Sequence, residues 1–185
     1  MLTADWVTAI ATVGTFLVIL ASAIAALAQL RHMRGSNQII ALTECRETLE
    51  SDGFRQAQQF VSYELPKRLR DLNEVRKIAE IPFVGDYQAI ATVANFFESM
   101  GAFVKNRIID RDIACDLWSG VVLRNWAALA PVIAYVRVEA GDDVWENFEL
   151  LAALSARHQR KAGTDYPAGF ERMPKDMTLV ELLKQ

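Results

Sequence analysis

The sequence predicts an all-α protein in which one N-terminal transmembrane helix is followed by a cytoplasmic bundle of about five helices. Two observations support this fold class. No charged residue interrupts the apolar segment from Trp6 to Leu30. Beyond residue 35, apolar residues recur at three- and four-residue steps, which is the spacing of a helix with one buried face. No alternation of apolar and polar residues, the pattern typical of strands, competes with that spacing.

The segment from Trp6 to Leu30 has the length and composition of a membrane span. A helix of roughly 25 residues is about 37 Å long, which exceeds a hydrocarbon core of about 30 Å. A cleaved signal peptide is disfavoured because Asp5 and no basic residue precede the segment, and because the apolar run is too long. A buried core helix is also disfavoured, since such a helix seldom lacks charge on every face.

The charges that flank this segment predict its orientation. Arg31 and Arg34 follow it, whereas only Asp5 and the amino terminus precede it. Because basic residues stay on the cytoplasmic side, we expect the N-terminus outside a bacterial inner (plasma) membrane and the rest of the chain in the cytoplasm. Trp6, Arg31 and Arg34 are the predicted membrane-interface anchors. Residues 1–35 then form the anchor.

Residues 36–160 are predicted to form the bundle domain, with helices at about 36–50, 54–65, 86–107, 110–138 and 144–160. Residues that favour helix N-termini stand before them: Ser36 or Asn37, Ser51-Asp52-Gly53, Asp110 or Asp112, and Gly141-Asp142-Asp143. Pro66 should end the second helix, and Pro131 should kink or split the fourth. The charged stretch 67–80 is expected to be a surface helix or a connector. Residues 161–185, rich in Gly and Pro, predict an extended tail with a short terminal helix.

The third of these helices carries the most apolar face and should lie at the centre of the bundle. Its predicted buried stripe is Ile90, Val93, Phe97, Gly101 and Val104.

Composition and motifs exclude several function classes. The net charge of −3 and the lack of a basic patch argue against a nucleic-acid partner. Cys45 and Cys115 are far apart and predict neither a disulfide framework nor a zinc site. His32 and His158 are expected to be solvated, and no nucleophile, phosphate-loop or metalloprotease motif occurs. We therefore expect no catalytic residue, no metal and no cofactor, and an enzyme is the less favoured interpretation.

Two charged residues interrupt apolar helical stretches: Glu98 in NFFESMGAF and Arg124 in LWSGVVLRNWAAL. Because an unpaired buried ion is costly, each must reach solvent or a partner. An ion pair of Glu98 with Arg124 or Arg137 inside the bundle is predicted, with Arg124 extending to the surface as the alternative. The same stretches permit a rival topology in which residues 89–104 and 117–138 are further membrane helices, although a mid-helix arginine opposes it.

The transmembrane segment itself has two different faces. Small or polar residues dominate one of them, at the alternating steps of four and three that two packed helices use. This predicted contact face consists of Thr8, Thr12, Thr15, Ile19, Ser22, Ala26 and Gln29. Large apolar residues repeat on the other face, at Val13, Leu17, Leu20, Ile24 and Leu27. We expect the first face to contact another membrane protein or a second copy of the chain, and the second to contact lipid.

One long run resembles a known bacterial family: NFFESMGAFVKNRIIDRDIACDLWSGVVLRNWAALAPVIAYVRVEAGDDVWENFELLAAL. It is similar to the family catalogued as domain of unknown function 4760, whose members also begin with a membrane span and a short basic stretch such as QLRHMR. The resemblance extends from about Trp6 to Arg160. It implies the same architecture and no particular activity.

These observations favour a membrane-anchored helical interaction module, serving as a scaffold or accessory subunit of a membrane protein complex. The alternative hypothesis is an enzyme or small-ligand sensor with a polar site in the bundle near Glu98.

Overall fold

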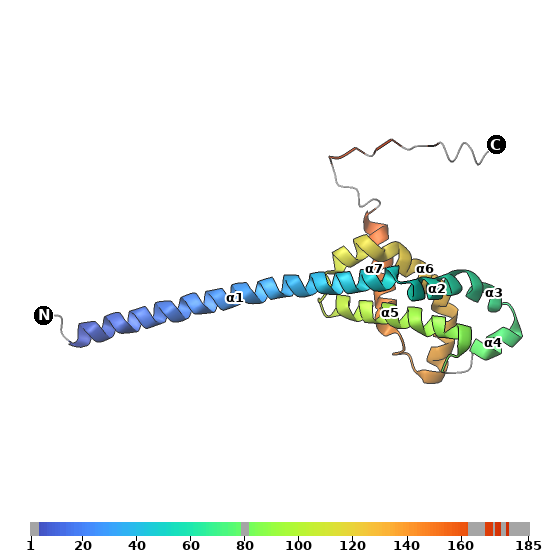
Figure 1. Cartoon of the computed structure of the whole chain (residues 1–185), viewed down its shortest axis with the longest axis horizontal. Helices are drawn as coiled ribbons and strands as arrows, with labels where there is room; N and C mark the ends of the chain where they lie inside the picture. Colours follow the sequence, from blue (N-terminus) through green and yellow to red (C-terminus); the bar gives the residue numbers. More distant parts are fainter. Residues whose placement is uncertain (1–3, 79–81, 163–168, 172, 175–176, 178–185) are drawn as a thin grey trace.

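The computed structural model describes residues 4–78, 82–162, 169–171, 173–174 and 177. Every regular element in these parts of the chain is a helix, which confirms the all-α prediction. The long helix α1 (Ala4–Glu50) projects far beyond the other helices, and only its C-terminal end lies against them (Figure 1). The predicted tail at 161–185 falls mostly outside the described residues.

The continuity of α1 corrects one prediction. The sequence predicts a separate helix capped by Ser36 or Asn37, but α1 passes through Gly35 without interruption. An interior glycine costs a helix only about 1 kcal/mol relative to alanine, so one glycine between two strong helical segments is tolerated. Near its end, Ala41 and Cys45 are buried against the bundle, which fixes that part of α1.

The next helical segment begins where predicted but continues further. The Ser51 hydroxyl accepts a hydrogen bond from the Phe54 amide at 3.3 Å and caps α2 (Asp52–Gln59). A π-helical turn (Phe60–Glu64) leads directly into α3 (Leu65–Arg68). The prediction that Pro66 ends the helix is wrong, because the helical segment continues from the π turn into α3, and Pro66 stands in the first turn of α3. The short helix α4 (Leu72–Ile78) occupies the charged stretch.

The remaining helices build the core. A 3₁₀ turn (Gly85–Tyr87) opens α5 (Gln88–Lys105), which is followed by α6 (Arg111–Ala140) and α7 (Glu146–Ala162). The predicted stripe of α5 is buried, and α5 contacts α2, α6 and α7, so its central position is confirmed. Phe97 of α5 stacks on Phe148 of α7 with ring centroids 5.0 Å apart. Pro131 does not split α6, whose flanking Val132 and Ile133 are buried.

Two of the described helices, α1 and α6, are long and apolar enough to cross a membrane. They differ in their surroundings. None of the most apolar stretch of α1 is buried, whereas 33% of that of α6 is buried inside the fold. Helix α5, the other helix of the rival topology, does not meet the same criterion. The N-terminal helix is therefore the better candidate for a membrane span.

Candidate functional site

Glu98 lies at a hydrogen-bonded contact between the middle of α5 and the start of α7, which we call the α5–α7 junction. Its Oε2 accepts a hydrogen bond from the Phe148 amide at 2.9 Å. Its Oε1 accepts a hydrogen bond from Asn147 Nδ2 at 2.6 Å. Both carboxylate oxygens therefore have partners within the fold, and both partners belong to the first turn of α7.

The local sequence explains why α7 needs a partner from another helix. The first N–H groups of any helix lack intrahelical acceptors, and a Ser, Thr, Asp or Asn side chain usually supplies one. The residue before α7 is Trp145, which has no side-chain acceptor and adopts a left-handed φ of 55°. Glu98 supplies the missing acceptor, and its negative charge also favours the positive end of the α7 dipole.

Two further contacts fix the geometry of this junction. Trp145 Nε1 donates a hydrogen bond to Asn95 Oδ1 at 2.8 Å. Gly101 allows the two backbones to approach closely, since a Cβ atom at this position would lie 2.1 Å from the carbonyl oxygen of Asn147. The packing of α7 on α5 thus explains both Glu98 in an apolar helix and Gly101 one turn later.

The predicted ion pair of Glu98 with Arg124 or Arg137 is wrong. Arg124 is exposed on α6, which agrees with the alternative prediction that it extends to the surface. Arg137 Nη1 pairs with Glu149 at 2.6 Å, and its Nε donates to the Val144 carbonyl oxygen at 2.9 Å. The sequence signal that could have found the true partner was the start of α7, which places Trp145 at a position that capping residues normally occupy.

A second polar group joins α6 and α7 and was missed in the sequence. His158 Nε2 lies 3.0 Å from Asp116 Oδ1, and the histidine side chain is only 20% exposed, so the expectation that it is solvated is wrong. Cys115, which directly precedes Asp116, is buried, and burial raises the pKa of its thiol. A neutral, buried thiol is a poor nucleophile.

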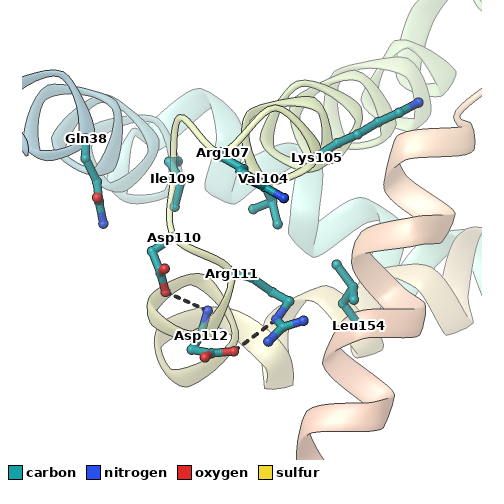
Figure 2. Close-up of a pocket in the computed structure, with 9 residues that line it drawn as sticks. All are labelled: Gln38, Val104, Lys105, Arg107, Ile109, Asp110, Arg111, Asp112 and Leu154. Atoms are coloured by element: carbon teal, nitrogen blue, oxygen red, sulfur yellow. Dashed lines mark hydrogen bonds and ion pairs between the residues drawn. The ribbon is translucent and has the colours of Figure 1, made fainter. Parts of the chain in front are cut away.

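A cavity of about 350 Å³ lies beside the loop that joins α5 to α6, and we call it the α5–α6 cavity (Figure 2). It is lined by Gln38, Val104, Lys105, Arg107, Ile109, Asp110, Arg111, Asp112 and Leu154. Asp110 Oδ1 accepts hydrogen bonds from the amides of Asp112 at 2.9 Å and Ile113 at 3.2 Å, so Asp110, one of the two predicted candidates, caps α6. Arg111 Nε pairs with Asp112 at 3.0 Å.

The predicted contact face of α1 is exposed along its whole length: Thr8, Thr12, Thr15, Ile19, Ser22, Ala26 and Gln29. The hydroxyl groups of its three threonines and of Ser22 donate to the carbonyl four residues earlier, at 2.8 to 3.0 Å. Such bonds satisfy the hydroxyl donors without a partner helix while leaving lone pairs available. Trp6 is 63% exposed, whereas the side chains of Arg31 and Arg34 lie outside the described residues.

Among the residues that the structure describes, no group of three or more His, Cys, Asp or Glu side chains is arranged to hold a metal ion. The model of the family described as Domain of unknown function (DUF4760) matches residues 16–155. No curated protein and no solved structure matches the chain.

Proposed function

The chain belongs to the family described as Domain of unknown function (DUF4760), and we propose that it is a membrane-anchored helical module that acts through protein contacts. In this role it is a scaffold or accessory subunit of a membrane protein complex. The observation that carries the proposal is the exposed apolar part of α1, which none of the other described helices covers (Figure 1).

The energetics of that exposed surface support an anchor. Large apolar side chains that remain at least 56% exposed include Val7, Ile10, Val13, Phe16, Leu17, Val18, Ile19, Ile24 and Leu27. Moving one such side chain from water into apolar surroundings gains about 1.5–3 kcal/mol, so water is a poor solvent for this helix. A bilayer covers every side of it at once. The asymmetry between Asp5 and the pair Arg31 and Arg34 supports an outside N-terminus and a cytoplasmic bundle in a bacterial inner membrane.

The unbroken course of α1 also supports self-association or binding to a partner's membrane helix. Beyond Gln29, the spacing of the predicted contact face continues through four exposed residues: Met33, Ser36, Ile40 and Thr43. Successive helical residues are about 100° apart, so buried Cys45 lies about 140° around the axis from Ile40. The bundle therefore packs mainly on the far side of α1 and leaves the contact face free as far as Ile40, whereas Thr43 lines a groove with Leu117 and Trp118 of α6.

Paired substitutions test the contact face. Replacing Thr15 and Ser22 with leucine should weaken the association of the full chain in membranes, measured by crosslinking or a membrane two-hybrid assay, because leucine prevents close approach. The matched controls Leu17→Ala and Ile24→Ala, on the opposite face, should leave association unchanged. Equal effects from both pairs would remove the evidence for a contact face.

Purification in mild detergent followed by mass spectrometry tests the broader proposal. A second protein, or a second copy of the chain, retained in a fixed ratio is the expected result, and the Thr15 and Ser22 double variant should lose it. Retention of a small molecule or metal instead would favour the enzyme or sensor alternative near Glu98. That alternative has less support, because both oxygens of this carboxylate accept hydrogen bonds from α7.

A further inference from the structure

The α5–α6 cavity lies close to the membrane surface if α1 is an anchor, so a role for the cavity at that surface rests on the proposed function. Gln38 of α1 lines the cavity and stands eight residues after Leu30, about 12 Å along the helix. The headgroup layer on each side of a bilayer is roughly 5–8 Å thick. The cavity wall at Gln38 is therefore within a few ångströms of the headgroups. Figure 1 shows the α5–α6 connection at the end of the bundle that faces the apolar part of α1.

The charges around the cavity favour an anionic ligand. Three cationic side chains line it, from Lys105, Arg107 and Arg111. Two carboxylates also line it, so the lining carries a net charge of +1. Asp110 caps α6, and Asp112 pairs with Nε of Arg111, which leaves the two Nη groups of Arg111 for a ligand. Among the described residues, neither Lys105 nor Arg107 has an ion-pair partner. Figure 2 shows the side chains of Arg107 and Arg111 bordering one space, whereas Lys105 points away from it.

The loop also exposes one apolar side chain beside its basic residues. Ile108 stays 42% exposed beside the basic residues, while Ile109 is fully buried and lines the cavity. Arg107 follows the end of α5 with a left-handed φ of 58°, a conformation that glycine adopts most readily. Glycine suits this left-handed backbone better than arginine does. A glycine substitution therefore removes the arginine side chain without destabilising the fold.

We propose that the α5–α6 cavity binds the phosphate of an anionic phospholipid headgroup through Arg107 and Arg111, and so holds the bundle against the membrane surface. Arginine pairs with phosphate through two parallel hydrogen bonds, which gives the site both affinity and orientation. Lys105, on the rim, adds attraction to the surface without a fixed geometry. The contact is electrostatic and should weaken as salt concentration rises.

Native mass spectrometry of the full chain in mild detergent tests this inference, with equal amounts of phosphatidylglycerol and phosphatidylcholine added. The wild-type chain should retain phosphatidylglycerol preferentially. Each basic residue near an anionic membrane surface changes binding about fivefold, so Arg107→Gln should reduce that preference about fivefold. The matched control Arg124→Gln removes the same charge from an exposed site on α6 and should leave the preference unchanged.

A second variant separates binding from folding. Arg107→Gly should lose the lipid preference while its melting temperature stays equal to or above that of the wild type, because glycine suits the left-handed backbone. Equal retention of both lipids by the wild type, or equal losses in Arg107→Gln and Arg124→Gln, would overturn the inference. A melting temperature raised by inorganic phosphate in wild type alone, without a lipid preference, would assign the site to free phosphate and overturn it as well.

Failure of the anchor is distinguishable from failure of this site. Extraction of the wild-type chain from membranes by alkaline carbonate would refute anchoring and the lipid contact together. A chain that resists extraction but shows no phosphatidylglycerol preference would refute the lipid contact alone.

Discussion

Replacing Glu98 with alanine removes the acceptor that two groups of the first turn of α7 share. The Phe148 amide loses its acceptor at 2.9 Å, and Asn147 Nδ2 loses its partner at 2.6 Å. Loss of a helix N-cap costs about 0.5–2 kcal/mol, and an unsatisfied buried donor costs about 1–3 kcal/mol. Because Glu98 is only partly buried, water replaces some of these contacts, and we expect the free energy of unfolding to fall by about 2–4 kcal/mol.

Thermal unfolding of the full chain in detergent, followed by tryptophan fluorescence, measures this loss. A change of that size corresponds to a melting temperature lower by roughly 4–16 °C. Trp145, one of the four tryptophans of the chain, reports directly on this junction, since its indole N–H bonds to Asn95 there. Glu98→Gln retains an acceptor for the Phe148 amide but loses the charge and the acceptor for Asn147 Nδ2, so its effect should be smaller than that of Glu98→Ala, about half as large.

Arg124→Ala is the matched control for the rejected ion pair. Its side chain is exposed, so we expect a change within about 0.5 kcal/mol. Destabilisation by Arg124→Ala equal to that of Glu98→Ala would refute the capping role and restore the pair. An unchanged melting temperature in Glu98→Ala would show that the α7 terminus does not depend on this carboxylate.

Close packing, thiol burial and membrane orientation can each be tested as well. Gly101→Ala should lower the free energy of unfolding by about 1–3 kcal/mol, because its Cβ would lie 2.1 Å from the Asn147 carbonyl oxygen. Gly120→Ala has no neighbour closer than 3.9 Å and should raise the free energy of unfolding by about 0.5–1 kcal/mol. Denaturant titration measures both changes. Burial raises the pKa of Cys45 from 9.0 to about 11, so its stabilising contribution should be complete below pH 9 and lost as pH rises through about 11. Urea midpoints across this range should fall more for the wild type than for Cys45→Ala, and parallel curves would contradict the burial argument. A cytoplasm-only reporter fused after Gln185 should be active, whereas activity of a periplasm-only reporter there would reverse the proposed orientation.

Sequence patterns were most reliable where they depend on local chemistry or on the side chains of one helix face. The buried stripe of α5 followed from apolar spacing, and the caps at Ser51 and Asp110 followed from side chains that accept bonds within one turn. Glycine and proline misled because their effect depends on context. Gly35 does not interrupt α1, and Pro66 lies inside a continuous helical segment after a π turn that the sequence does not reveal.

The partners of charged residues were beyond sequence reasoning for a physical reason. An apolar helix with one charge shows that the charge needs compensation, but several groups can provide it at similar cost. Arg124, Arg137 and the amides of α7 were all chemically suitable for Glu98. The choice among them depended on how α7 crosses α5, and that crossing is set by the close approach of Gly101 to Asn147, two residues 46 positions apart in the chain.

The sequence by itself therefore determined the all-helical class, the apolar N-terminal helix and the central place of α5, because helical periodicity and hydrophobicity act over a few neighbouring residues. Only the tertiary structure decided that Glu98 caps α7, that Arg137 pairs with Glu149, and that basic residues gather at the α5–α6 cavity. These arrangements depend on the distances between helices, and such distances result from the packing of the whole core.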